Sequence, residues 1–349
     1  MSKKRFRFQH RTFTFKTPAK TSRNTLYTKP SWILELSDES GNVGYGECSL
    51  IPTLSPDDVS LIEQRLNTWS DDPSGIPEDL SEIQDTPALR FAMEMLLRSY
   101  HADDPFRLFN APFSQGDEGI LMNGLIWMDS FEGVLQQIQD RVDEGFEIIK
   151  MKVGAEEFNY ELDLLTAIRE RFPSDRYELR LDANGAFTPE NALLRLEKLA
   201  QFDIHSIEQP VKPRQWSAMR ELTSNSPIPI ALDEELISNR EKNETLEAIQ
   251  PQYLILKPSL IGGWRESEEW IQVAKEHGSN WWATSALESN LGLNAIAQWC
   301  AVQETELPQG LGTGRLYTEN IPCPLHIKKA HLWYGDTPWE VAPFLDAES

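Results

Sequence analysis

Charged side chains recur at a regular spacing through the middle of this chain, each near the end of a short apolar segment. In chain order they are Lys150, Lys152, Asp182, Glu208, Asp233, Lys257 and the pair Thr284-Ser285. From Lys152 to Lys257 the intervals are 30, 26, 25 and 24 residues, which is about the length of one strand-helix unit. Because equivalent strand ends meet on one rim of a parallel barrel, we expect these side chains to converge where barrel enzymes place their chemistry.

The three acids in this series predict a metal site. Asp182, Glu208 and Asp233 would repel one another strongly at one barrel mouth unless a cation neutralised them. Oxygen ligands without His or Cys favour Mg²⁺ or Mn²⁺ over zinc. Any one of these acids alone would be better explained as a strand-end or helix cap. Three at consecutive strand ends, flanked by lysines, favour the metal interpretation.

The lysines predict proton transfer beside that metal. Strand alternation places Lys150 and Lys152 on one face, pointing into the barrel. A dication and a second ammonium both disfavour a protonated amine, so we expect a lowered pKa for Lys152 and a role as a base. Lys257 is expected on a strand across the barrel. The arrangement suits removal of a proton α to a carboxylate, with the metal stabilising the enediolate. The alternative, that lysines only neutralise the acids, is credible for Lys150.

Elements that could position these residues alternate along the chain in the pattern of a parallel sheet covered by helices. The fold class predicted is α/β, a (β/α)₈-type barrel. An open doubly wound sheet is the alternative, but no glycine-rich nucleotide fingerprint follows an early strand. Strands are expected at 121–126, 147–153, 178–182, 204–208, 228–233, 253–257, 280–284 and, weakly, 307–311, with helices at 131–143, 158–171, 189–201, 216–224, 241–249, 264–277 and 291–303.

An α+β unit precedes the barrel. We expect a three-stranded meander at 5–16, 31–36 and 42–48, then helices at 57–69 and 87–100. The expected domains are a capping domain at 1–110, a barrel at 111–320 and a C-terminal segment at 321–349. In that segment 325–334 reads as one strand returning to the cap. Loops near 17–25 and 49–55 are expected to shape specificity and exclude water.

Composition limits the classes of partner and compartment. The chain has 349 residues and a net charge of −22, so nucleic acid and anionic membrane are improbable partners, and no protein partner is predicted. Three cysteines without metal-type spacing fit a reducing cytoplasm. The basic first 34 residues resemble a transit peptide in charge, but the alternation of Phe6/Phe8 and Phe13/Phe15 indicates a strand.

Taken together, these motifs resemble the enolase superfamily, and within it the muconate-lactonizing subgroup. The residues that carry the resemblance are Lys150-Met-Lys152, Arg180-Leu-Asp182-Ala-Asn184, Ile207-Glu208-Gln209-Pro210, Leu232-Asp233-Glu234, Leu256-Lys257-Pro258 and Thr284-Ser285-Ala-Leu-Glu288-Ser289. The resemblance implies Mg²⁺ (or Mn²⁺) held by the three acids, with Lys152 and Lys257 as catalytic residues assisted by Lys150. It also implies substrate contacts from Arg180, Asn184, Thr284 and Ser285. Enolase-superfamily sites are known for Lys or His bases working with Mg²⁺.

Within the subgroup, the first barrel strand, Asn123-Gly-Leu-Ile-Trp127, and Arg180 are most similar to the o-succinylbenzoate synthase family of menaquinone biosynthesis. That similarity implies a lyase that dehydrates 2-succinyl-6-hydroxy-2,4-cyclohexadiene-1-carboxylate. A dipeptide epimerase or N-acylamino acid racemase with the same core stays open as an alternative, and a catalytically silent binding barrel is improbable with these residues intact. Two departures from the family pattern, Glu235 and Asn290, leave substrate contacts open.

Overall fold

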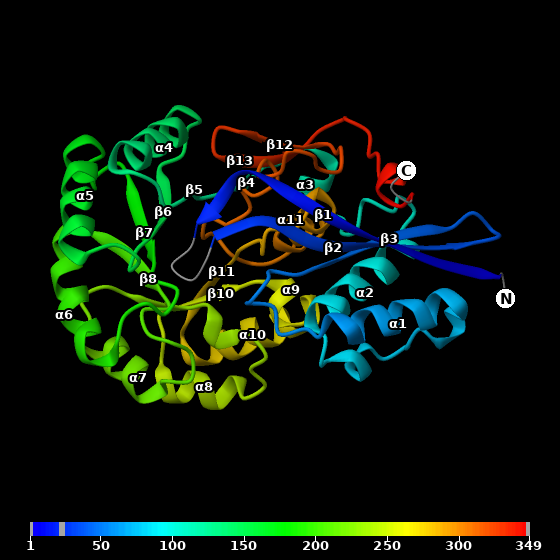
Figure 1. Cartoon of the computed structure of the whole chain (residues 1–349), viewed down its shortest axis with the longest axis horizontal. Coiled ribbons are helices and arrows are strands. Elements are labelled where there is room, and N and C mark those ends of the chain that lie inside the picture. The colour runs from blue at the N-terminus through cyan, green and yellow to red at the C-terminus, as the bar shows by residue number, and fades with distance from the viewer. Residues whose placement is uncertain (1–2, 21–24, 347–349) are drawn as a thin grey trace.

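The computed structural model describes residues 3–20 and 25–346. Its first element is an antiparallel sheet ordered β1-β2-β3, formed by β1 (Lys4–Lys20), β2 (Thr25–Asp38) and β3 (Val43–Ser49). Apolar side chains alternate along β1, and Phe6, Phe13 and Phe15 are buried. The predicted meander is confirmed, and the basic N-terminal segment is a strand. In Figure 1, β1 and β2 extend from the cap helices toward the barrel.

Two helices complete this cap. α1 (Val59–Asp71) and α2 (Pro87–Tyr100) lie where the helical spacing of apolar residues predicts them. Their buried side chains form a small core with the sheet that includes Trp32, Leu66 and Leu96. α2 approaches β3 so closely that a Cβ atom at Gly46 would lie 2.4 Å from the Ala92 carbonyl oxygen. Only glycine therefore fits at that position of the strand.

The barrel follows after the short helix α3 (Pro112–Gln115). Seven parallel strands lie in the order β11 to β5, each preceding at least one helix. The strands are β5 (Gly124–Ile126), β6 (Ile148–Lys152), β7 (Glu178–Asp182), β8 (Ile204–Glu208), β9 (Ile230–Leu232), β10 (Tyr253–Leu256) and β11 (Asn280–Ala283). The helices are α4 (Phe131–Asp143), α5 (Phe158–Arg171), α6 (Pro189–Leu199), α7 (Trp216–Asn225), α8 (Lys242–Ile249), α9 (Pro258–Ile261), α10 (Trp264–His277) and α11 (Asn290–Cys300). Figure 1 shows the longer helices on the outside of the strands.

An irregular segment closes the sheet into a barrel. The weakly expected eighth strand is two bridge residues: Gln309 pairs with Met122 ahead of β5, and Gly310 pairs with Thr284 after β11. The Ala283 N–H also donates to Gln309 Oε1 at 2.7 Å. First and last strands are therefore joined through 309–310. The chain has the predicted (β/α)₈-type barrel with an N-terminal capping sheet.

The C-terminal segment differs in part from its prediction. Residues 325–334 form a hairpin of β12 (Leu325–Lys328) and β13 (His331–Tyr334), which pairs with β4 (Ile120–Leu121). The expectation of one strand returning to the cap sheet is wrong, because the positive-φ residues Lys329 and Ala330 reverse the chain. Contact with the cap comes later, where Phe344 stacks on Phe13 with ring centroids 6.2 Å apart.

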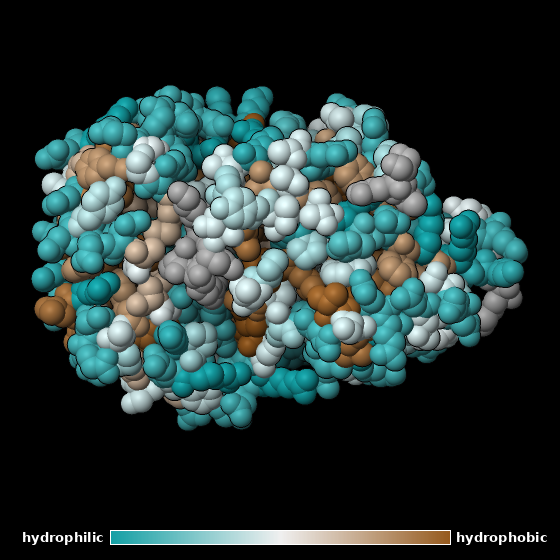
Figure 2. Space-filling model, viewed as in Figure 1, coloured by the Kyte–Doolittle hydropathy of each residue, from teal (hydrophilic) through white to brown (hydrophobic). Residues whose placement is uncertain are grey.

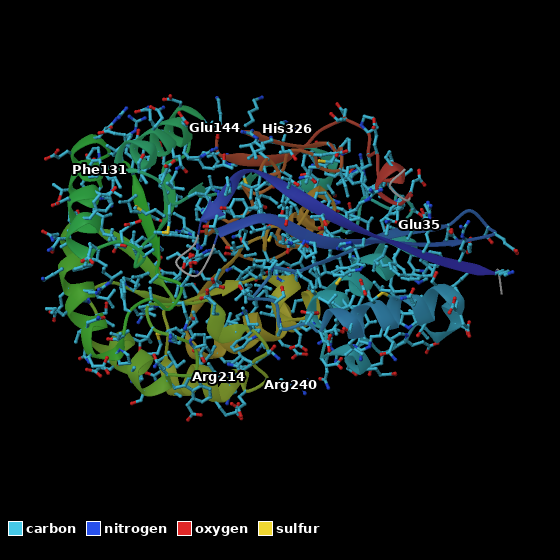
Figure 3. The ribbon with its side chains drawn as sticks, in the orientation of Figure 1. Glu35, Phe131, Glu144, Arg214, Arg240 and His326 are labelled. Carbon is cyan, nitrogen blue, oxygen red and sulfur yellow. The ribbon has the colours of Figure 1, made fainter. Side chains whose placement is uncertain are left out.

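The end of α4 is linked to this hairpin by one arginine. Arg315 pairs with Glu144 at 2.9 Å and donates to the carbonyl oxygen of Ile327 at 3.3 Å. Figure 3 shows Glu144 and His326 near one another at the upper edge of the molecule. The hairpin therefore covers the barrel beside its closing segment.

The cap is fixed to the barrel through the start of α10. On α2, Arg90 pairs with Glu266 at 2.6 Å, and Glu94 accepts from the Trp264 N–H at 2.5 Å. A carboxylate at a helix N-terminus satisfies free N–H groups and the helix dipole. Burial raises the pKa of Glu94 to about 7, although the Trp264 N–H and Arg90 act in the opposite direction. The contact between α2 and α10 therefore includes a carboxyl that titrates near neutral pH.

The outer surface is mainly polar. Figure 2 shows hydrophilic residues over most of the visible face, with hydrophobic residues gathered near its middle. Within 3–20 and 25–346, no helix combines the length and the apolar character needed to cross a membrane.

Glu94→Gln is expected to change how stability depends on pH. A raised folded-state pKa means that the folded protein binds more protons than the unfolded chain between about pH 4.5 and 7, so Glu94 makes stability fall as pH rises through that window. The Gln variant keeps an oxygen acceptor for Trp264 but does not titrate. We compare the free energy of unfolding of the Gln variant with that of the wild type at each pH. We expect this difference, variant minus wild type, to be roughly 2 kcal/mol larger at pH 8 than at pH 5.

Urea denaturation at both pH values measures this difference. Glu276→Gln is the matched control, because it changes an exposed carboxylate near the end of α10, away from the helix start that Glu94 contacts. A difference between wild type and Glu94→Gln that is independent of pH would contradict the expectation.

Candidate active site

Three buried carboxylates converge at the carboxyl ends of adjacent strands. Asp182 ends β7, Glu208 ends β8, and Asp233 directly follows β9. The register pairs Lys152 with Asp182 and Asp182 with Glu208. One carboxylate oxygen from each acid lies within 4.8 Å of the others, and all three residues are buried. The parallel register therefore brings together acids that are 26 and 25 residues apart in sequence.

The donor set fits a divalent cation. Glu208 Oε1 is buried without a hydrogen-bond partner in the described part of the chain. An unpaired buried carboxylate oxygen costs free energy unless a cation or donor reaches it. Three oxygen donors with no His or Cys are the ligand type of hard divalent ions. Asp182, Glu208 and Asp233 therefore form a divalent-metal site, as the sequence predicts.

Three lysines balance these acids. Lys150 pairs with Glu208 and lies 3.2 Å from Asp182, Lys152 lies 2.9 Å from Asp182, and Lys257 lies 2.5 Å from Asp233. Burial lowers the pKa of Lys150 and of Lys257, but the facing carboxylates outweigh burial, so both pKa values lie above the ordinary value.

The pKa values of Asp182 on β7 and Glu208 on β8 are shifted in opposite directions. Burial would raise the pKa of Asp182, but the ammonium groups of Lys150 and Lys152 outweigh burial and hold it below its ordinary value. Burial raises the pKa of Glu208 to about 7, because Lys150 only partly offsets it and the neighbouring acids add to it. The negative charge of these buried carboxylates is therefore stabilised only by nearby cations.

Lys152 and Lys257 stand on opposite sides of the metal site. β7, β8 and β9, which carry the three acids, lie between β6 and β10 in the sheet. Lys150, Lys152 and Lys257 all line one pocket at this end of the barrel. A molecule in this pocket would therefore have a lysine on either side, as the sequence predicts.

Asn184 holds Lys152 in place. Its Oδ1 accepts from Lys152 Nζ at 2.7 Å, and its amide donates to Glu234 Oε1 at 2.9 Å. Asn184 has a φ of +45°, a region that Asn tolerates better than most residues. It also lines the pocket, and its contact to Lys152 is one that the sequence did not reveal.

Gln209 is a functional residue that sequence reasoning missed. Its Oε1 accepts from the backbone N–H groups of Asp233 at 3.2 Å and Glu235 at 3.1 Å. Its amide donates to the Val211 carbonyl oxygen at 3.0 Å. Gln209 therefore fixes the turn that carries Asp233. Its position directly after Glu208 is the only sequence signal, and that position does not indicate the direction of its side chain.

Thr284 and Ser285 both line the pocket, but their hydroxyl groups differ. The Ser285 hydroxyl donates to Glu288 at 2.5 Å and accepts from the Thr313 hydroxyl at 2.7 Å and the Leu287 N–H at 3.1 Å. One donor and two acceptor sites are all that a hydroxyl has. Thr284 Oγ1 has no partner in the described part of the chain. A substrate can therefore bind the Thr284 hydroxyl, but the Ser285 hydroxyl has no capacity left.

Arg180 does not reach the pocket. It lies one inward-facing position before Asp182 on β7 and is 0% exposed. Its guanidinium stacks 4.3 Å from the centroid of Trp282, pairs with Glu178 at 2.8 Å and donates to the Pro308 carbonyl oxygen. Strand parity places Arg180 inside the barrel, but it does not line the pocket, so its predicted substrate contact stays a prediction.

The two departures from the family pattern also lie outside the pocket. Glu235 accepts from the Arg214 N–H at 3.0 Å and from the Trp216 indole N–H at 2.8 Å. Figure 3 places Arg214 near the lower edge of the molecule. The Asn290 amide donates to the carbonyl oxygen of Ile321 at 2.7 Å. Both side chains hold loops together.

Cap residues form part of the pocket wall. Ile51, Pro52, Thr53 and Leu54 line it, as expected for the loop at 49–55. Leu26 of β2 also lines it, whereas residues 21–24 of the expected loop at 17–25 lie outside the described residues. Asn123 and Trp127 complete the wall beside β5. Only Asn123 among these carries a buried oxygen, Oδ1, without a partner in the described part of the chain.

Comparisons with known proteins agree with this geometry. A family model described as Enolase C-terminal domain-like matches residues 133–338. The chain is 44% identical to the o-succinylbenzoate synthase of Desulfotalea psychrophila over 90% of this chain and 94% of that protein. The crystal structure of MenC from Desulfotalea psychrophila LSv54 superposes with a TM-score of 0.85 at 40% identity, covering 95% of this chain and 100% of that chain. The muconate lactonizing enzyme of Pseudomonas fluorescens has the same fold, with a TM-score of 0.83 at 20% identity over 98% and 99% of the chains.

Replacing one of the three acids is expected to abolish tight divalent-metal binding. Asp233→Asn removes a ligand charge and leaves Lys257 without its partner at 2.5 Å. We expect the affinity for Mg²⁺ and Mn²⁺, measured by isothermal titration calorimetry, to fall by more than the roughly 100-fold that loss of an outer-shell partner costs. Asp163→Asn, which changes an exposed carboxylate on α5, is the matched control. Wild-type affinity in Asp233→Asn would show that the metal lies elsewhere.

Proposed function

Since the chain belongs to the muconate-lactonizing subgroup of the enolase superfamily, we propose that it acts as an o-succinylbenzoate synthase. The reaction is the dehydration of 2-succinyl-6-hydroxy-2,4-cyclohexadiene-1-carboxylate to 2-succinylbenzoate in menaquinone biosynthesis, which makes the enzyme a hydro-lyase. The observation that carries the proposal is the 44% identity to an o-succinylbenzoate synthase over nearly the whole of both chains. Two lysines on opposite sides of a carboxylate triad are what this chemistry requires.

Mg²⁺ is the proposed metal, with Mn²⁺ as the alternative ion. Asp182, Glu208 and Asp233 would hold it through carboxylate oxygens. When bound, the ion supplies positive charge that offsets the negative charge developing on the substrate carboxylate. The dry surroundings of the three acids strengthen that electrostatic interaction.

Lys152 is the proposed base and acid. Its neutral amine takes the proton α to the substrate carboxylate, and the electron pair of the broken C–H bond moves toward that carboxylate, which becomes an enediolate. Its ammonium then delivers the proton to the departing hydroxyl, so that the C–O bond breaks and water leaves. When the C–O bond breaks, the electron pair of the enediolate returns to form the new double bond of the ring. Lys152 returns to its neutral form and the product ring is aromatic. Asn184, 2.7 Å from Lys152 Nζ, keeps the amine directed during both transfers.

Lys257 and Lys150 act as cations in this proposal. Lys257, on the far side of the metal ligands, faces the substrate opposite Lys152 and stabilises the charge that forms after proton removal. Lys150 is more deeply held, pairing with both Glu208 and Asp182. We assign it to balancing the charge of these two acids.

The cap completes the site. We propose that a domain at 1–110 closes over a barrel at 111–320, with the segment 321–349 contacting both. The loop at 51–54 and Leu26 would then exclude water from a small carboxylate substrate. Thr284, whose hydroxyl has free capacity, is the proposed polar contact in the wall formed by β11.

We expect the purified protein with Mg²⁺ to form an aromatic product from the cyclohexadiene substrate. Ultraviolet absorbance measures the formation of this product. Lys152→Ala should lower kcat by at least roughly 100-fold, the usual loss when a general base is removed. Metal affinity should stay within a few-fold, because Lys152 is not a ligand.

A parallel assay of dipeptide epimerisation and N-acylamino acid racemisation separates the alternatives. Epimerisation without 2-succinylbenzoate formation would replace the proposed activity with the epimerase. Substrate binding that persists in the wild type without any turnover would support a binding protein instead.

A further inference from the structure

A buried polar network outside the metal centre joins the cap sheet to two loops of the barrel. Its members come from segments far apart in sequence, and each is at most 3% exposed. They are Lys29, Ser31, Glu47 and Ser49 in the cap, with Ser259, Ser285, Glu288 and Ser289 in the barrel. Three of these residues are charged. Fully buried charges are costly, so a network of this kind requires a specific explanation.

Glu47 forms the half of the network at α11. Its carboxylate accepts from the Ser289 N–H at 2.9 Å, the Ser289 hydroxyl at 2.5 Å and the Gly292 N–H at 2.9 Å. It also accepts from Ser31 at 3.0 Å. These bonds satisfy N–H groups at the helix start. A cap residue therefore anchors the helix that follows the pocket loop.

Glu288 forms the other half. One carboxylate oxygen accepts from the Ser259 hydroxyl and the other from the Ser285 hydroxyl, both at 2.5 Å. Ser285 lines the pocket, whereas Glu288 is 0% exposed and lies behind that wall. A Cβ atom at Gly292 would lie 2.8 Å from Glu288 Cβ, so glycine at this position of α11 leaves room for the Glu288 side chain.

Lys29 supplies the opposite charge. Its ammonium donates to Ser49, and burial lowers its pKa while the charges of Glu288 and Glu47 act to raise it. Lys29 comes from β2 and both glutamates contact barrel elements, so the cap and the barrel each contribute charge to one dry cluster.

Ser259 connects this cluster to a reacting group. It lies in α9, whose first turn starts at Lys257, and the Leu260 N–H donates to the Lys257 carbonyl oxygen at 2.8 Å. The Ser259 hydroxyl is thus a side-chain anchor for the single turn that carries Lys257. Glu288 holds that anchor and the Ser285 wall with one rigid carboxylate.

We propose that Glu288 is a positioning residue that fixes the Lys257 turn through Ser259 and the pocket wall through Ser285. The catalytic consequence rests on the proposed function, because it takes Lys257 as the cation facing the substrate. The hydrogen bonds of Glu288 with Ser259 and with Ser285, here called its two arms, allow the effect on Lys257 and the effect on the pocket wall to be tested separately. Loss of the Ser259 arm displaces Lys257, and loss of the Ser285 arm loosens the wall against which substrate binds.

Steady-state kinetics of the full-length enzyme with Mg²⁺ tests the two arms. We expect Ser259→Ala to lower kcat about tenfold with KM within twofold, and Ser285→Ala to raise KM about tenfold with a smaller change in kcat. Glu288→Gln should show both effects, because an amide cannot accept from both serines through two oxygens. Ser267→Ala on α10 removes a buried hydroxyl that donates to the Gly263 carbonyl oxygen, and as the matched control it should change neither constant.

Hydrogen exchange gives a readout that does not need turnover. Amides in a peptide covering 257–263 should exchange at least tenfold faster in Ser259→Ala and Glu288→Gln than in the wild type or Ser267→Ala. Exchange rates equal to the control would overturn the proposal whatever the enzyme catalyses. If exchange rises in these variants but the wild type forms no 2-succinylbenzoate, the positioning role stands and the proposed function is refuted. If Glu288→Gln does not fold, the two serine variants decide the matter, and kinetics equal to Ser267→Ala would refute the catalytic role.

Discussion

The confinement of three carboxylates within 4.8 Å of one another is the constraint on which the rest of the structure depends. In a dry barrel mouth these charges are tolerable only with cations around them, and the chain supplies Lys150, Lys152 and Lys257 at contact distance. The parallel sheet makes the arrangement possible because consecutive strands end at the same rim. Charge that would destabilise a smaller fold is thereby turned into a binding site for a divalent ion.

A barrel rim alone leaves such a site open to water, and the cap changes that. Leu26 and the loop at 51–54 form apolar wall, while Lys29 and Glu47 enter the barrel-side network. Arg90 and Glu94 bind the start of α10, so the cap also contacts the barrel through residues that do not line the pocket. The same contacts that hold the two units together therefore keep the site dry, and dryness strengthens every ionic interaction in it.

The sequence predicted those features that depend on periodicity. Strand alternation and unit length located the acids and the lysines, because residues at strand ends in a parallel barrel share one height. It failed where the determinant is a contact distant in sequence. Arg180 has the right parity but does not line the pocket, and the Ser285 hydroxyl accepts from Thr313, which is 28 residues away. The bond between Glu47 and Ser289 spans 242 residues, a pairing that no local pattern encodes. The closing segment at 309–310 is too irregular to show strand periodicity.

Core and specificity are consequently built from different kinds of residue. The acids and lysines pair mainly with one another. A muconate lactonizing enzyme at 20% identity has the same fold, and one fold can serve several reactions. Discrimination between substrates must come from wall groups that keep free hydrogen-bonding capacity. In the described part of the chain, Thr284 Oγ1 and Asn123 Oδ1 are wall atoms of this type, and they flank the closing segment 309–310 on either side. A buried polar atom without a partner penalises any ligand that cannot pair with it. Regular strand pairing ends at the closing segment 309–310. Substitutions in the wall on either side of it are therefore expected to change substrate specificity without disturbing the metal site.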